Sequence, residues 1–109
     1  MKWYDDLYVG ESIIHKTIQV KWKILHNAGQ INIYVITLLS NDKNLLDIIP
    51  SHELLQRGYP KKDLYVVGLA KGYNEAVQTA AAIVDEVYRS TGTFDIASYL
   101  QKKRRSLKS

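Results

Sequence analysis

The residues best suited to bind a ligand lie in two short loops. The first loop follows an apolar run and consists of Lys71, Gly72, Tyr73 and Asn74. Because this loop precedes a strong helical pattern, its backbone N–H groups, the helix dipole and the lysine together could bind a phosphate or a carboxylate. The spacing from Gly68 to Gly72 matches neither the Walker A loop nor the dinucleotide-binding motif. The alternative is that the two glycines serve only packing and the turn.

The second loop consists of Ser40, Asn41 and Asp42. If the strands that end at Leu39 and Ala70 are parallel neighbours, both loops leave the sheet at the same edge, where open α/β sheets bind ligands. The two loops then predict one site for an anionic small molecule, such as a phosphorylated or acidic metabolite. The alternative is that Asn41 and Asp42 cap a helix, which is their commonest role before an apolar run.

No set of residues indicates catalysis, a metal or a cofactor. The chain has no cysteine. Its three histidines, His15, His26 and His52, are too far apart in sequence for a helical metal pair. Ser51 precedes His52 but lacks the flanking glycines of a nucleophile elbow. The sequence therefore favours a non-catalytic protein over an enzyme.

The first half of the chain predicts a β-hairpin. Apolar and polar side chains alternate over 18–25, and an Asn- and Gly-containing turn separates this stretch from an apolar run at 31–39. The open alternative is a helix over 12–26, because another set of apolar residues recurs at helical spacing, namely Ile14, Ile18, Trp22 and Leu25.

The second half predicts helices around one further strand. We expect a helix at about 42–49, a short second helix at 51–55, a strand at 63–70 parallel to the one at 31–39, a long helix over 73–90 and a final helix from about 95. The predicted fold class is therefore α/β, a small mixed sheet in which a β-hairpin and a parallel strand are packed by helices in two or three layers.

The length and the charge distribution limit the classes of partner. A chain of 109 residues suits a single domain, here 1–109 with a short basic tail at 102–109. The net charge is +4, but residues 1–101 carry ten basic and eleven acidic side chains. Because the positive charge belongs to the tail and no aromatic residue interleaves it, we expect no nucleic-acid binding, with the tail as the only candidate for it.

The remaining expectations concern location and assembly. Two carboxylates near the start and the lack of a long apolar run predict no export, no membrane segment and a cytoplasmic location. Trp3, Tyr4 and Tyr8 either close the core or form a binding surface, and we expect the former. Abundant aromatic residues without a catalytic set favour a binding or assembly module that forms a homo-oligomer. A small enzyme or ligand-binding domain is the alternative.

Overall fold

The computed structural model describes residues 1–38, 45–61 and 64–108, with the backbone alone for 105–108. The elements in chain order are β1 (Lys2–Val9), the 3-10 helix η1 (Glu11–Lys16), α1 (Thr17–Leu25), β2 (Ile33–Leu38), β3 (Leu46–Pro50), the 3-10 helix η2 (Ser51–Leu55), β4 (Tyr65–Lys71), α2 (Tyr73–Thr91) and α3 (Ile96–Lys108). None of the helices within the described residues is both long enough and apolar enough to cross a membrane.

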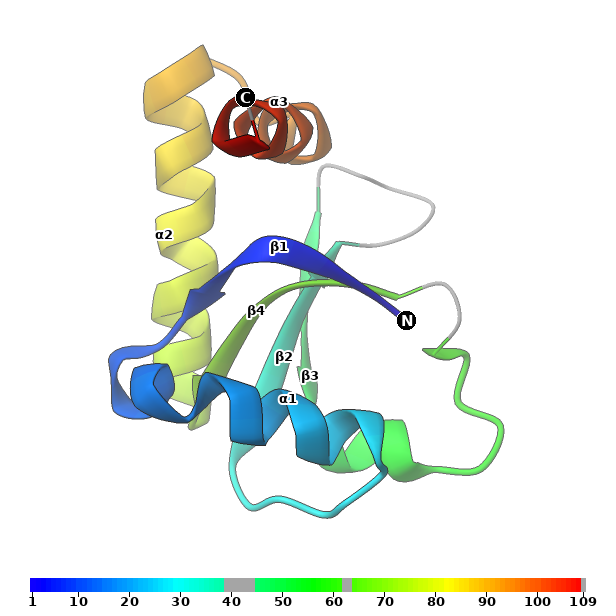
Figure 1. The fold of residues 1–109 in the computed structure, drawn as a ribbon. Coiled ribbons are helices and arrows are strands. Elements are labelled where there is room, and N and C mark those ends of the chain that lie inside the picture. The colour runs from blue at the N-terminus through cyan, green and yellow to red at the C-terminus, as the bar shows by residue number, and fades with distance from the viewer. Residues whose placement is uncertain (39–44, 62–63, 109) are drawn as a thin grey trace.

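The four strands form one mixed sheet in the order β1-β4-β2-β3 (Figure 1). β1 pairs with β4 in the parallel sense, whereas β2 is antiparallel to both β3 and β4. The α/β fold class with a mixed sheet, one hairpin and one parallel pair is therefore confirmed, although different segments build the hairpin and the parallel pair.

Helices cover both faces of the sheet. On one face, Ile13, Val20 and Ile24 of η1 and α1 pack with Val35 and Leu69 of the central strands. On the other face, the side chains of α2 and α3 join those of β2 and β4 in a second cluster, which includes Ile83, Val87, Ile96, Leu100, Ile36 and Val67. The molecule thus has three layers, with the sheet in the middle.

The predicted strand at 18–25 is wrong, and the helical alternative fits. η1 leads directly into α1, so residues 11–25 are helical throughout. Val20 and Ile24 are buried, whereas Ile18 and Trp22 face outward. The apparent alternation arises because two apolar faces of one helix interleave in the sequence, and over so few positions it resembles the period of a strand.

The predicted helix at 42–49 is also wrong within the described residues. Leu46–Pro50 is strand β3, the hairpin partner of β2, with Ile36 opposite Ile48. The β-branched residues Ile48 and Ile49 favour this conformation, and Pro50 is tolerated at the end of an edge strand. Without a helical crossover, β4 returns antiparallel to β2, so the predicted parallel pairing of these strands is wrong.

The remaining predicted helices are confirmed. The long helix and the final helix are confirmed as α2 and α3, and the short helix at 51–55 as the 3-10 helix η2. In the N-terminal aromatic segment, Tyr4 is buried and its hydroxyl donates to Leu100 O at 3.2 Å, so this residue closes the core as expected, whereas Trp3 and Tyr8 are half-buried. That segment is edge strand β1, which the sequence analysis did not anticipate.

Candidate functional site

The two predicted ligand loops do not share an edge of the sheet. Ser40, Asn41 and Asp42 lie outside the described residues. Leu38, at the end of β2, pairs with the first residue of β4, whereas Lys71 pairs with Ile33 at the far end. The expectation of a common edge required parallel strands and is therefore wrong.

The loop before α2 already holds a carboxylate from the chain itself. Gly72 has a φ of +84°, which favours glycine, and precedes the exposed first residues of α2, Tyr73 and Asn74. Glu75 accepts hydrogen bonds from the backbone N–H of Lys71 at 3.1 Å and from Ser12 Oγ at 2.7 Å. A negative charge in the first turn is the arrangement that the helix dipole favours.

The electrostatics of Glu75 follow from these contacts. Burial disfavours its charged form, but the hydrogen bonds from Ser12 and Lys71 outweigh burial, so the pKa of Glu75 lies below its ordinary value of 4.5. An external anion would have to compete with this carboxylate. Ligand binding at Lys71, Gly72, Tyr73 and Asn74 stays a prediction.

A partly buried cluster of Tyr8, Glu86, Tyr99 and Lys103 joins β1, α2 and α3, and we call it the Glu86 cluster. Tyr8 OH donates to Glu86 Oε2, and Tyr99 OH donates to the same oxygen at 2.8 Å. Lys103 Nζ lies 3.2 Å from Glu86 Oε2 and 3.0 Å from Tyr8 OH. Arg104 forms a neighbouring ion pair with Asp5 at 2.8 Å. Two of the basic tail residues are thus bound to the body of the protein.

The pKa values in this cluster favour a permanent charge pair. Burial opposes the charge of Glu86, but its three hydrogen-bond donors outweigh burial and lower the pKa of Glu86. Burial likewise opposes the charge of Lys103, yet the Glu86 carboxylate raises the pKa of Lys103. Burial, followed by the bond to Glu86, raises the pKa of the Tyr8 phenol. The Tyr8 phenol stays a protonated donor, so the cluster is suited to fixing α3 rather than to transferring protons.

The outer face of α1 exposes four large apolar side chains. Their exposed fractions are 53% for Ile14, 85% for Ile18, 56% for Trp22 and 51% for Leu25. Ile18, Trp22 and Leu25 recur at steps of four and three residues and share one side of α1, and Ile14 lies in the 3-10 helix η1 that leads into α1. The opposite side of α1, with Val20 and Ile24, is already buried in the core. We call Ile18, Trp22 and Leu25, together with Ile14 of η1, the outer face of α1.

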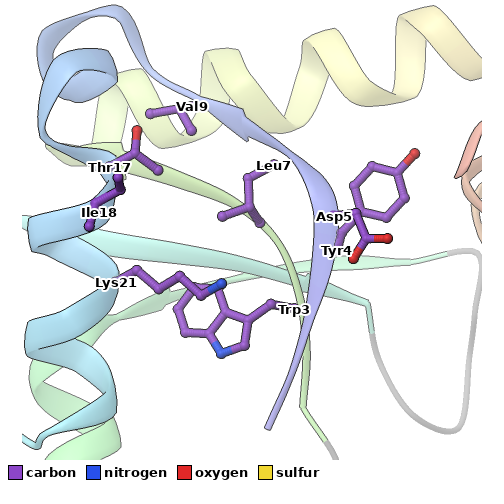
Figure 2. A pocket seen from close by; sticks show the side chains of 8 residues that line it. All are labelled: Trp3, Tyr4, Asp5, Leu7, Val9, Thr17, Ile18 and Lys21. Atoms are coloured by element: carbon purple, nitrogen blue, oxygen red, sulfur yellow. The ribbon is translucent and has the colours of Figure 1, made fainter. Parts of the chain in front are cut away.

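A groove runs between α1 and the edge strand β1 beside this face (Figure 2). It has a volume of about 440 Å³ and is lined by Trp3, Tyr4, Asp5, Leu7, Val9, Thr17, Ile18 and Lys21. Its β1 wall results from an irregular strand, because Trp3 pairs with Val66 but Tyr8 pairs with Gly68. The chain between Trp3 and Tyr8 therefore bulges away from β4. Ile18 belongs to both the groove and the outer face of α1.

The two tryptophans of the chain lie at these two features. Lys21 Nζ lies 5.0 Å from the centre of the Trp3 ring, which is within the range of a cation–π interaction. The Trp3 Nε1 atom is buried and has no hydrogen-bond partner among the described residues. The Trp22 ring stacks on the His26 ring with centroids 4.1 Å apart. Lys21 of α1 thus contacts the Trp3 indole, and His26 at the C-terminal end of α1 contacts the Trp22 indole.

Neither a metal-ligand cluster nor a hydrogen-bonded Ser51–His52 pair is present in the described part of the chain. No group of three or more His, Asp or Glu side chains there could hold a metal ion. Ser51 Oγ is buried without a hydrogen-bond partner in the same residues, and His52 is exposed, so His52 does not activate this serine.

The comparisons with known proteins add no assignment. No family model, curated protein or solved structure matches the chain. The candidate site therefore depends on the geometry alone. In the sequence, the residues of the outer face are indicated only as part of an alternative helix over 12–26. The signal for the surface was the presence of two apolar faces on one helix, since a helix on one side of a sheet cannot bury both.

Proposed function

We propose that this protein is a non-catalytic assembly module that forms a homodimer through the outer face of α1. The observation that carries the proposal is the exposure of Ile18, Trp22 and Leu25 on one side of α1, whose other side is buried, and of Ile14 in η1, which leads into it. Full burial of one such side chain stabilises a complex by about 1.5–3 kcal/mol. Four of them, each about half exposed or more, offer several kcal/mol to a partner.

A second copy is the occupant that this surface fits best. Apolar faces pair with apolar faces, so two copies of the same helix face are complementary in polarity, and twofold dimers are the commonest assemblies. Apolar patches on monomers rarely exceed ~300–600 Å², and a stable dimer buries about 800 Å² on each partner. One helix face alone thus predicts a weak dimer with a dissociation constant in the micromolar range or above.

The test compares two variants with the same change in charge on the same helix. In Ile18→Lys, a charge enters the centre of the outer face, and we expect a monomer. In Gln19→Lys, the charge enters at an exposed neighbouring position beside the face, and we expect an association close to that of the wild type. Sedimentation equilibrium between about 10 and 500 μM distinguishes these outcomes. A wild-type protein that is strictly monomeric over this range contradicts the proposal.

Two other functions have less support from the geometry. The Glu75 carboxylate already accepts a hydrogen bond from the Lys71 N–H at the start of α2, which weighs against the binding of an anionic metabolite there. Lys103 and Arg104 are engaged by Glu86 and Asp5, which weighs against a free nucleic-acid-binding tail. A cytoplasmic location stays a prediction.

A further inference from the structure

We infer that the groove between α1 and β1 is the seat for the Trp22 side chain of a second copy of the chain. This inference rests on the proposed homodimer and specifies how its two copies contact one another. Each copy would insert one indole and receive one, so that the twofold contact contains two equivalent aromatic insertions. Buried tryptophans in fitted pockets commonly supply most of the affinity of an interface.

The groove has the size and the lining for an aromatic side chain. A cavity of about 150 Å³ is sufficient for benzene, and the groove holds about 440 Å³. Leu7, Val9 and Ile18 provide aliphatic walls, and Trp3 offers an indole beside them (Figure 2). An indole entering between these side chains would leave water on contact with apolar atoms on several sides, which is the environment that favours it most.

Trp22 is held in an exposed position before any partner arrives. Its ring stacks on His26 with an angle of 20° between the planes, and His26 Nδ1 lies 2.8 Å from the backbone oxygen of Trp22. A side chain that is already ordered loses less conformational entropy on binding. Trp22 also lies four residues after Ile18, so it projects about one helical turn away from the groove of its own chain.

The groove contains an acidic residue, which α1 lacks. Lys21 and Lys23 flank Trp22 in the sequence, and α1 contains no acidic residue. The groove is lined by Asp5, whose side chain is half exposed and contacts Arg104, and by Lys21, which covers the Trp3 ring of its own chain. An incoming Trp22 would bring Lys23 of the second copy toward Asp5. Because like charges repel, this docking is favoured over one in which two basic helices lie side by side.

The test mixes a chain that lacks the indole with a chain whose groove is filled. Trp22→Ala removes the insertion, and Thr17→Phe fills the groove from the α1 side. Each variant alone loses both insertions of its homodimer. In the mixture, Trp22 of the Thr17→Phe chain can enter the intact groove of the Trp22→Ala chain. If one aromatic contact is worth about tenfold in affinity, each variant dimerises about 100-fold more weakly than the wild type, and the mixture associates about tenfold more tightly than either.

Controls separate a filled groove from a damaged fold. Thr79→Phe is the matched control, because Thr79 is also a half-buried helical threonine with a hydroxyl bonded to a backbone oxygen one turn earlier, but it lies on α2. Val9→Phe fills the same groove from the β1 side. Circular dichroism melting checks that each variant folds, and sedimentation equilibrium gives the affinities.

Each outcome decides between the two proposals. If Thr17→Phe and Val9→Phe dimerise like the wild type while Ile18→Lys is a monomer, the insertion into the groove is wrong and the assembly surface stands. If the mixture is no tighter than its components, the insertion is also wrong. If free indole binds the groove and the groove-filled variants still dimerise, the groove is a small-molecule site instead. A strictly monomeric wild type overturns both proposals.

Discussion

Thr37 shows how a single polar atom can limit the stability of a small core. Its side chain is fully buried in β2, and its hydroxyl has no hydrogen-bond partner among the described residues. Burying a hydroxyl without a partner costs about 1–3 kcal/mol.

We therefore expect Thr37→Val to stabilise the protein by about 1 kcal/mol. Valine has nearly the same shape, so the packing should not change. The measurement is chemical denaturation monitored by circular dichroism. Thr79→Val is the control, because its hydroxyl already bonds to Glu75 O at 2.8 Å and its loss should bring no gain. A destabilised Thr37→Val protein would mean that the hydroxyl has a partner in solution.

Glu75 gives a prediction that depends on pH. Glu75→Gln removes the charge beside the start of α2 and should lower the free energy of unfolding at pH 7 by about 0.5–1 kcal/mol. Since the pKa of Glu75 in the folded protein lies below its ordinary value of 4.5, the stabilisation is complete above that value and is lost as the pH falls through the lower, folded-state pKa.

The measurement compares urea denaturation of the wild type and of Glu75→Gln at pH 7 and near pH 2.5. We expect the difference between the two proteins to be present at pH 7 and to shrink at the lower pH. An equal difference at both pH values would mean that the charge of Glu75 does not stabilise α2.

At the scale of elements, the contact between β1 and β4 depends on a residue without a side chain. A Cβ atom at Gly68 would lie 2.9 Å from the backbone oxygen of Tyr8 and 3.1 Å from Ile36 Cδ1. Backbone cannot move aside as a flexible side chain can, so the strands would have to separate. Gly68 therefore permits the close approach of the parallel edge strand.

We expect Gly68→Ala to destabilise the protein by about 1–3 kcal/mol. Gly29→Ala is the matched control, because the nearest atom to its added Cβ is Leu55 Cδ1 at 3.9 Å. The control should be neutral or slightly stabilising, since alanine restricts the unfolded chain more than glycine does. Thermal melting of the two variants provides the comparison, and equal melting temperatures would show that β1 can move away without cost.

The same elements show what the sequence could and could not predict. The periodicity of α2 is long enough to define one buried face, so its type and extent were predictable. The types of α1 and β3 were not predictable, because a short apolar run fits a helix and a strand equally well until tertiary contacts bury one of its sides. β1 was missed because Asp5 and Asp6 interrupt its apolar pattern where the strand bulges from β4.

The candidate site was predictable only in part. The exposed face of α1 was present in the sequence as the helical spacing of Ile14, Ile18, Trp22 and Leu25, but spacing does not tell which of two apolar faces meets the sheet. The groove depends on β1, whose place beside β4 arises from a pairing across more than fifty residues. The prediction that the two loops form one site assumed that β2 and β4 are parallel, but these strands are antiparallel.

At the scale of the whole molecule, the basic tail divides into a bound part and a remainder. Lys103 contacts Glu86 and Asp6, and Arg104 contacts Asp5, so the charges of these two residues are largely balanced by the body. A chain that ends after Arg104 keeps these ion pairs. A chain that ends after Gln101 loses them together with part of α3.

We expect the two truncations to differ in stability. Ending the chain after Gln101 should lower the free energy of unfolding by about 1–2 kcal/mol, a value discounted for the partial exposure of these pairs. Ending it after Arg104 should change stability little. Chemical denaturation measures both, and elution of the longer truncation from a heparin column, compared with the full chain, tests the nucleic-acid alternative. Equal stability of the two truncations would mean that the ion pairs of Lys103 and Arg104 do not hold α3.

The parallel pairing of β1 with β4 also limits when β1 can pair during the synthesis of the chain. β1 precedes β4, its partner strand among the described residues, which begins at Tyr65, and Tyr4 reaches its hydrogen-bond acceptor only when Leu100 is present, 96 residues later. At about 5–20 residues per second, β1 waits roughly 3–12 s for β4 to be completed. During that time Trp3, Tyr4 and Leu7 lack the strand beside which β1 pairs. β1 is thus made well before the strand and the helix that hold it in place.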